Sequence, residues 1–252
     1  MTTISATPGI SPRRIEEASI NAWPALRQLL LDGWLLRFSG GFTKRANCIV
    51  PLYPALQPLP EKVRFCENLY ARERLQTVFR LISIGTDEQL DDYLSQRGYR
   101  RADPTEVLIA PAAAISQPGI PAIRLCSRDQ WLDAYTALTR LPIAAQPLHS
   151  AILKGVQTEC AYALLDQGGE PAACGLGVLE HGLLGLFDVF TDPEHRGRGC
   201  AHAVVSQLIG WGASRGAATT YLQVSADNAP ARALYARLGF KSSHHYWYRI
   251  SG

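Results

Sequence analysis

The segment from Thr191 to Val205, TDPEHRGRGCAHAVV, places two glycines and several basic side chains between a strand-like run and a helix-like run. Gly197 and Gly199 have no Cβ atom, so a ligand can approach the backbone closely there. A helix that begins at this point directs unpaired N–H groups and a partial positive charge toward that ligand. These features predict a phosphate or pyrophosphate site. The alternative is an ordinary glycine turn between a strand and a helix.

Two well-known phosphate-binding motifs do not fit this segment. The Walker pattern GxxxxGK[ST] does not occur in the chain, and GRGCAH lacks the third glycine of a dinucleotide-binding fingerprint. The segment also follows a predicted antiparallel meander, whereas the dinucleotide fingerprint follows a parallel strand. An ATP-dependent transferase would need a lysine or acidic magnesium ligands in the loop, and none is present.

The elements around this loop are predicted from periodicity and turn residues. Three apolar strand-like runs, separated by the turns QGGE and HG, predict an antiparallel meander that ends at Thr191. A long helix, a strand, a second helix and a last strand follow, which predicts a βαβ-like crossover. In this half the predicted strands cover residues 122–127, 160–166, 172–180, 183–191, 219–225 and 244–251, and the predicted helices cover 129–140, 147–156, 199–216 and 229–240.

The first half of the chain shows a similar order of elements. Its predicted helices cover residues 14–22, 60–73 and 87–98, and its predicted strands cover 33–41, 46–53, 77–83 and 105–110. Both halves end with a strand, a helix that closes on a glycine and an aromatic residue, and another strand, which favours a duplication. We expect an α/β fold with a mixed, mostly antiparallel sheet and helices on both faces. A linker rich in alanine, glycine and proline predicts two domains, residues 1–118 and 119–252.

Composition excludes several classes of protein. Apolar residues make up 47% of the 252 residues, enough for a packed core, and the net charge of +3 is too small to indicate a nucleic-acid surface. No apolar run reaches the length of a membrane span, and the N-terminus lacks the apolar core of a signal peptide, so we expect a cytoplasmic protein. The six cysteines form no CxxC pair and no HExxH motif occurs, so we expect buried free thiols and no metal.

Two segments resemble the signatures of the GCN5-related N-acetyltransferase (GNAT) family. That family carries [RQ]-x-x-G-x-[GA] at the start of its central helix, and Arg196, Gly199 and Ala201 match this pattern. Downstream, NAPARALYARLGF, from Asn228 to Phe240, resembles the second signature N-x-x-A-x-x-x-Y-x-x-x-G-F. The resemblance covers residues 121–250, and the first half resembles a degenerate copy. It implies a tandem GNAT-like fold.

The resemblance also implies roles for individual residues. Tyr235 would protonate the leaving thiolate as general acid, although a core tyrosine on an amphipathic helix is the alternative. The phosphate loop would bind the coenzyme A pyrophosphate, the preceding strand end would bond the pantetheine arm as an added strand, and one amide would contact the coenzyme. The implied coenzyme-binding residues are Val189, Phe190, Thr191, Arg196, Gly197, Arg198, Gly199, Cys200, Ala201, His202 and Asn228.

The general base is where this chain departs from the family pattern. Many relatives place a glutamate five residues before the asparagine, and this chain has Gln223 there, which cannot take a proton. We expect Asp188 to act instead, directly or through water. The alternative is that Asp188 is a structural carboxylate, and Glu180 and His181 are weaker candidates for the base.

The first half lacks the features that coenzyme binding needs. The connector PALQPLPE contains three prolines and no glycine, and proline has no N–H for a pyrophosphate. The position that corresponds to the tyrosine of the second signature is Leu94. We therefore expect no coenzyme in this half. Five of its residues could form a wall that recognises the acceptor, for a carboxylate or another anion, or could be a solvated strand edge: Trp34, Arg37, Lys44, Arg45 and Asn47.

These inferences predict an acetyl-CoA-dependent N-acetyltransferase in which a free amine attacks the thioester directly. Cys200 is a poor nucleophile candidate because it lies in the phosphate loop. We expect a primary amine on a small metabolite or amino acid as acceptor, in preference to a protein, with no nucleic-acid or membrane partner and with a homodimer left open. The alternative is a non-catalytic acyl-CoA-binding sensor or interaction module, which Gln223 favours and Tyr235 disfavours.

Overall fold

The computed structural model describes residues 10–84, 88–112 and 123–252. We call residues 10–112 the N-terminal half and residues 123–252 the C-terminal half. The N-terminal half contains α1 (Pro12–Ala22), β1 (Arg27–Leu31), β2 (Trp34–Phe38), the short helix η1 (Lys44–Ala46), β3 (Ile49–Pro51), α2 (Leu59–Arg72), β4 (Val78–Ile82), α3 (Glu88–Gln96) and β5 (Arg100–Pro111).

The C-terminal half contains the longer strands and the helix that follows the glycine loop. Its elements are β6 (Arg124–Cys126), α4 (Arg128–Thr139), α5 (Gln146–Lys154), β7 (Glu159–Gln167), β8 (Glu170–Glu180), β9 (Leu183–Thr191), the short helix η2 (Pro193–His195), α6 (Cys200–Ala213), β10 (Thr219–Ser225), α7 (Ala229–Arg237) and β11 (Lys241–Ile250).

Local sequence signals explain where several helices begin. Ser11 caps α1, with Pro12 in its first turn. Ser127 and Gln130 form a reciprocal capping box at the start of α4. Asn228 caps α7 by accepting a hydrogen bond from the N–H of Ala231. Side chains therefore satisfy backbone donors that these helix ends would otherwise leave unpaired.

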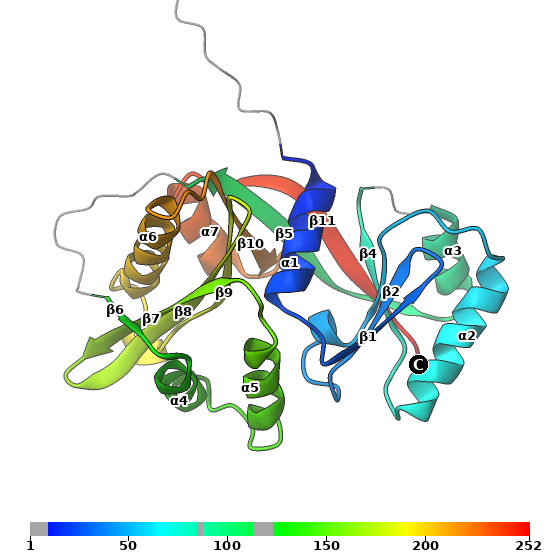
Figure 1. Cartoon of the computed structure of the whole chain (residues 1–252), viewed down its shortest axis with the longest axis horizontal. Coiled ribbons are helices and arrows are strands. Elements are labelled where there is room, and N and C mark those ends of the chain that lie inside the picture. The colour runs from blue at the N-terminus through cyan, green and yellow to red at the C-terminus, as the bar shows by residue number, and fades with distance from the viewer. Residues whose placement is uncertain (1–9, 85–87, 113–122) are drawn as a thin grey trace, which may run out of the picture.

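The described strands form one mixed sheet, shown in Figure 1, with the order β1-β2-β3-β4-β11-β5-β10-β9-β8-β7-β6. In the C-terminal half, β7, β8 and β9 form the predicted antiparallel meander, and β9 runs parallel to β10 with α6 between them. The predicted meander and crossover are therefore confirmed. In the N-terminal half, β1, β2 and β3 also pair antiparallel, and β3 runs parallel to β4 with α2 between them.

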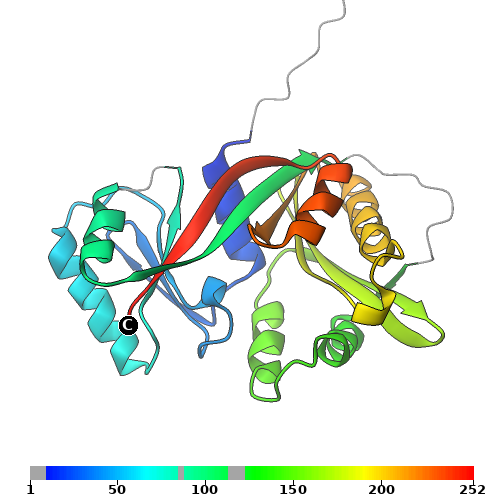
Figure 2. The same cartoon turned by 180° about the vertical axis from the view of Figure 1, so that it is seen from behind.

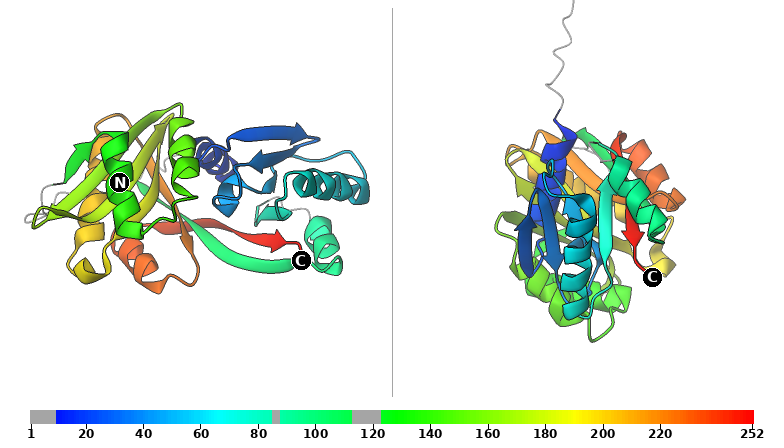
Figure 3. Two further views of the ribbon diagram at one scale, coloured as in Figure 1. Left: turned by 90° about the horizontal axis from the view of Figure 1, so that it is seen from below. Right: turned by 90° about the vertical axis from the view of Figure 1, so that its right-hand side faces the viewer.

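The two halves exchange their long final strands. β5 lies between β10 and β11, and β11 lies between β4 and β5. Figures 2 and 3 show these two strands crossing from one half to the other. The C-terminus consequently lies in the N-terminal half, where the N–H of Ser251 bonds the carbonyl of Thr77. The similar order of elements supports the predicted duplication, which stays a prediction.

Helices cover both faces of the sheet, as predicted. α4 and α6 both contact β7, β8 and β9. The adjacent β7 residues Ala163 and Leu164 belong to different apolar clusters, the first with Val204 of α6 and the second with Trp131 of α4. Because successive strand residues point to opposite faces, these two helices lie on opposite sides of the sheet.

A single apolar core connects the two halves. The cluster that holds Trp131 also includes Ile15 of α1, Val50 of β3 and Tyr246 of β11. A further cluster lies under α2 and α3 in the N-terminal half. The predicted division at residues 118 and 119 lies within 113–122, outside the described residues, and stays a prediction.

Sequence reasoning missed β1 and underestimated β5. β1 is an edge strand whose residues are mostly exposed, so it lacks the alternating pattern of a half-buried strand. β5 extends from Arg100 to Pro111, whereas the predicted strand covers only residues 105–110. The additional residues Arg100–Ala102 pair with β11, a partner that local sequence cannot reveal. None of the described helices is long and apolar enough to cross a membrane.

Candidate active site

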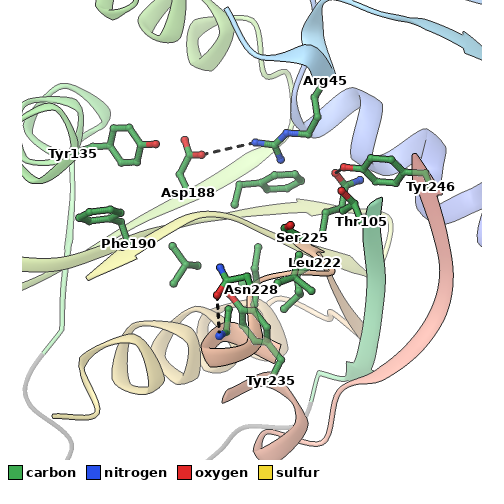
Figure 4. A pocket seen from close by; sticks show the side chains of 16 residues that line it. Arg45, Thr105, Tyr135, Asp188, Phe190, Leu222, Ser225, Asn228, Tyr235 and Tyr246 are labelled. Atoms are coloured by element: carbon green, nitrogen blue, oxygen red, sulfur yellow. Dashed lines mark hydrogen bonds and ion pairs between the residues drawn. The ribbon is translucent and has the colours of Figure 1, made fainter. Parts of the chain in front are cut away.

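A cavity opens where two parallel strands separate. β9 and β10 pair only from Leu183 to Leu186 opposite Thr219 to Leu222, although both strands continue beyond that point. Asp188, with φ 47°, interrupts the regular course of β9. The cavity of about 360 Å³ is lined by Leu186–Phe190 of β9, by β10 and by α7. Figure 4 shows Asp188 and Arg45 on one side of it and Asn228 and Tyr235 on the other.

The start of α6 has the backbone geometry of an anion site. Gly197 and Gly199 have φ values of 74° and 79°, which L residues rarely adopt. A Cβ atom at either glycine would meet no atom within 4 Å, so the space above them is open. The first backbone bond of α6 runs from the N–H of Ala203 to the carbonyl of Gly199, and no side chain caps the helix. The N–H groups of Cys200–His202 are therefore free to bind an anion.

The side chains of this loop have separate roles. Arg196 donates from Nε to the carbonyl of Thr191 at 3.4 Å, which holds the loop against the end of β9. Cys200 is 1% exposed, and its thiol lies 3.5 Å from the carbonyl of His195, so it points into the protein. This orientation agrees with the exclusion of Cys200 as a nucleophile. His202 lies 3.4 Å from the hydroxyl of Ser206.

Asp188 has two charged or polar neighbours. Its Oδ2 lies 2.9 Å from Nε2 of His149 on α5, and its Oδ1 lies 4.0 Å from a guanidinium nitrogen of Arg45. A carboxylate oxygen only accepts hydrogen bonds, so the Nε2–H group of His149 is the donor. The Asp188 side chain is 9% exposed and lines the cavity. The structure thus places the predicted base in the cavity, with one oxygen bonded to a histidine and the other near a cation.

His149 is fully buried in a cage of aromatic rings. Its ring centroid lies 4.8 Å from that of Tyr135 and 6.1 Å from that of Trp131, both on α4, and 5.6 Å from Trp23 and 5.5 Å from Phe42 in the N-terminal half. Its Nδ1 has no hydrogen-bond partner among the described residues. Packing from both halves therefore holds the ring in place, and its one polar contact is Asp188.

Tyr235 also lines the cavity. It lies on α7, is 7% exposed and packs against Phe240 with ring centroids 5.6 Å apart. Burial raises the pKa of its hydroxyl to about 12. The hydroxyl therefore keeps its proton at neutral pH. It makes no hydrogen bond to another described residue, so it is available to a ligand in the cavity.

Asn228 and Gln223 line the same cavity. Asn228 uses its carbonyl oxygen to accept the N–H of Ala231 at 3.2 Å, so it caps α7. Its NH₂ group remains for the predicted coenzyme contact. Gln223, at the usual glutamate position, accepts a hydrogen bond from the hydroxyl of Tyr246 at 3.1 Å. It therefore orients a neighbouring side chain.

The five residues singled out in the N-terminal half have different environments. Trp34, Arg37 and Asn47 are buried, so the interpretation as a solvated strand edge is wrong for them. Lys44 forms an exposed ion pair away from the cavity. Arg45 is the member of this group that lines the cavity. Backbone groups are hydrogen-bonded to the Asn47 amide and to both terminal nitrogens of Arg37, which charge patterning does not show.

The connector of the N-terminal half has an internal anion where a phosphate would bind. The carboxylate of Asp32 accepts hydrogen bonds from the N–H groups of Leu56 and Gln57, at 3.0 Å and 2.9 Å. These bonds and the nearby Lys62 lower the pKa of Asp32. A second anion at this connector would be repelled, and the absence of a coenzyme from this half stays a prediction.

Sequence reasoning missed His149, Tyr135, Thr105 and Tyr246. A lone histidine on a predicted helix carries no spacing signal, and the others come from elements that meet only in the folded chain. All six cysteines are free, as predicted, although Cys126 and Cys160 are only half-buried. No group of three or more histidine, cysteine, aspartate or glutamate side chains among the described residues could hold a metal ion, and the absence of a metal stays a prediction.

Comparisons with known proteins agree with this geometry. The family model described as "Probable histone acetyltransferase Rv0428c C-terminal" matches residues 10–249. The uncharacterized N-acetyltransferase YobR of Bacillus subtilis is 28% identical over 243 residues, which cover 93% of this chain and 97% of YobR. The probable histone acetyltransferase Rv0428c of Mycobacterium tuberculosis is 27% identical over 238 residues, which cover 94% of this chain and 72% of that protein.

Solved structures show the same fold. The GCN5-related N-acetyltransferase from Kribbella flavida superposes with a TM-score of 0.70 at 17% identity, covering 97% of this chain and 96% of that one. The GCN5-related N-acetyltransferase from Sphaerobacter thermophilus gives a TM-score of 0.63 at 17% identity, covering 93% and 84%. The chain therefore belongs to the Rv0428c C-terminal acetyltransferase family and is an N-acetyltransferase of the GNAT type.

Proposed function

We propose that this enzyme transfers the acetyl group of acetyl-CoA directly to the primary amine of a small molecule. The observation that carries the proposal is that a carboxylate and a tyrosine hydroxyl line the same cavity. Asp188 presents a carboxylate there, and Tyr235 presents a buried, protonated hydroxyl. A proton acceptor and a proton donor at the splayed ends of β9 and β10 are the two groups that direct transfer to an amine requires.

The donor would lie along the start of α6 and the edge of β9. The free N–H groups of Cys200–His202, with the open space above Gly197 and Gly199, suit a pyrophosphate. Beyond Leu186, β9 has no pairing with β10, so the backbone of Val189–Thr191 can bond an extended pantetheine arm as a strand would. Acetyl-CoA supplies the thioester that the acceptor amine attacks.

Asp188 would take the proton that the amine loses, directly or through one water molecule. The hydrogen bond from His149 holds Oδ2, which leaves Oδ1 nearer to the cavity and to Arg45. Tyr235 would return a proton to the departing thiolate. A tyrosine with a pKa of about 12 holds its proton at neutral pH, and it would hydrogen-bond the sulfur and pass its proton to it as the carbon–sulfur bond breaks.

Two observations favour this proposal over its alternatives. The cavity of about 360 Å³ has the size of a small-molecule site, which supports a small acceptor over a protein. The acid and the base on one cavity, together with membership of an acetyltransferase family, support catalysis over a non-catalytic sensor.

Acetyl-CoA binding can be tested with a matched pair of variants, Gly199→Asp and Gly199→Asn. Aspartate and asparagine both tolerate the left-handed backbone at this position, so the two variants differ mainly in charge. Calorimetric titration of wild type should show binding in about the micromolar range. The aspartate variant should bind at least about tenfold more weakly than the asparagine variant, because its carboxylate repels the pyrophosphate.

The second step is to measure release of the coenzyme A thiol with a panel of primary amines. Transfer to at least one small amine would support the proposal. Absence of acetyl-CoA binding by wild type, or equal binding by the two Gly199 variants, would contradict the assigned donor site.

A further inference from the structure

The guanidinium of Arg45 lies at the cavity with one long ion pair and no hydrogen bond to another described residue. It lies over the ring of Trp23, 4.7 Å from the centroid, and 5.9 Å from the centroid of Phe187. No described residue accepts a hydrogen bond from it, and the closest carboxylate oxygen, Oδ1 of Asp188, is 4.0 Å away. Among the described residues that line the cavity, Arg45 is the single cation. Its side chain is 27% exposed, so a ligand in the cavity can reach its N–H groups.

The chain holds Arg45 in place through buried polar contacts. The buried guanidinium of Arg37 donates hydrogen bonds to the carbonyls of Arg45 and Trp23, the two residues that stack on each other. Asn47 braces the preceding loop from inside, because its amide makes four hydrogen bonds to the backbone. Its partners are Ser39, Gly41, Phe42 and Thr43, at 2.7 to 2.9 Å. Arg45 is therefore preorganised, so ordering it on binding costs little.

We propose that Arg45 binds a carboxylate of the acceptor, so that the acceptor is an amino acid or a compact amino-acid-like zwitterion. This inference rests on the proposed function. A guanidinium presents parallel N–H groups that match a carboxylate, and stacking on Trp23 leaves its N–H edge free. Asp188 binds the amine of the same molecule. Because the two side chains approach within 4.0 Å, the carboxylate and amine that they hold must be close neighbours, as in an α- or β-amino acid.

The N-terminal half thus supplies the specificity of a site whose chemistry lies in the C-terminal half. An acceptor without a carboxylate makes no charge-assisted hydrogen bond to Arg45, and it meets no steric clash there. Such contacts correspond to about a 10- to 100-fold preference.

The test compares acceptors that differ only in their carboxyl group. Initial rates of coenzyme A release are measured for the standard L-amino acids and for their primary amides, with wild type, Arg45→Gln and Lys44→Gln. Lys44 is the matched control, because it is the adjacent cation and its exposed ion pair with Asp103 lies outside the cavity. For the best acceptor, the acid-to-amide ratio of kcat/KM in Lys44→Gln should stay within about threefold of the wild-type ratio. In Arg45→Gln this ratio should fall about 10- to 100-fold below the wild-type ratio, mainly through KM.

Comparing the acid-to-amide ratio between variants cancels the intrinsic difference in basicity between the two amines. An acid-to-amide ratio that Arg45→Gln leaves unchanged from wild type overturns the inference and leaves the proposed function intact. If no amine is acetylated, calorimetry measures whether wild type and the two variants bind the same amino acids. Amino-acid binding that is lost only in Arg45→Gln supports a carboxylate site at Arg45 and contradicts the proposed transfer reaction, and no Arg45-dependent binding overturns both. Thermal unfolding of each variant checks that the fold is retained.

Discussion

Replacing Asp188 with asparagine separates its proposed proton-accepting role from its structural role. Asp188 has φ 47°, in the left-handed region, where asparagine is tolerated nearly as well as aspartate. The asparagine carbonyl oxygen can still accept the hydrogen bond from Nε2 of His149, which is 2.9 Å long in the wild type. The variant therefore keeps the shape and the backbone of the site and removes the group that we propose takes the proton.

The expected loss of activity is much larger than the expected loss of stability. A general base contributes about 10²- to 10⁴-fold to the rate, which corresponds to about 3–5 kcal/mol of activation free energy. The hydrogen bond from His149 changes from charge-assisted to neutral, at a cost of about 1 kcal/mol in the free energy of unfolding. For a chain of this length such a cost lowers the unfolding midpoint by about 2–4 °C.

The assay is the initial rate of coenzyme A thiol release, measured against pH with saturating acetyl-CoA. Asp188→Asn should lose most of kcat, and the variant should show a higher pH optimum because the amine must lose its proton to solvent. Asp188→Ala is the structural control, since it adds the strain of a left-handed alanine, about 1 kcal/mol, and removes the partner of His149. An asparagine variant that keeps a rate within about threefold of wild type and the same pH profile would show that the proton goes elsewhere.

Two further predictions concern buried groups. Tyr235→Phe should lower kcat about 100-fold or more. Calorimetric binding of acetyl-CoA and the unfolding midpoint should stay near wild type, because the hydroxyl has no hydrogen-bond partner among the described residues. An unchanged kcat would mean that the thiolate leaves without this proton. Burial opposes the charge of Glu16, but Arg80 and His244 outweigh burial and lower the pKa of Glu16 from 4.5 to about 2. The charge of Glu16 therefore stabilises the fold above about pH 4.5, and this contribution is lost as the pH falls toward 2. Glu16→Gln leaves Arg80 unpaired, so it should lower the free energy of unfolding by about 3–5 kcal/mol at neutral pH. Urea unfolding of the variant should also show a weaker dependence of this free energy on pH below about 4.5. A variant whose stability falls with pH in parallel with the wild type would contradict this assignment.

The features that sequence analysis predicted correctly are mostly local. Gly197 and Gly199 stand at positive φ values where α6 begins, and Gly239 has a positive φ just after the last turn of α7. The turns QGGE and HG join the predicted antiparallel strands. Each of these features depends on backbone conformations that a few neighbouring residues determine, so spacing and residue type are sufficient to recognise them.

Features that depend on contacts between distant residues were not recognisable in the same way. Trp34 and Arg37 lie in a segment with the charge pattern of a surface strand, yet both are buried. The long strand β5 pairs with β10 and β11 of the other half, and no local signal specifies these partners. A charged side chain in a sequence does not show whether carbonyl groups will be available to satisfy it in the interior.

The sequence by itself predicted the candidate donor site and the candidate base: a glycine loop before a helix, a tyrosine on the next helix and a carboxylate near the end of β9. Only the tertiary structure brought together the proposed acceptor side. It places His149 against Asp188, 39 residues away along the chain, and Arg45 of the N-terminal half at the same cavity. The physical reason is that a glycine loop acts through its own backbone, whereas an acceptor pocket requires side chains that only the packing of both halves around one sheet brings together.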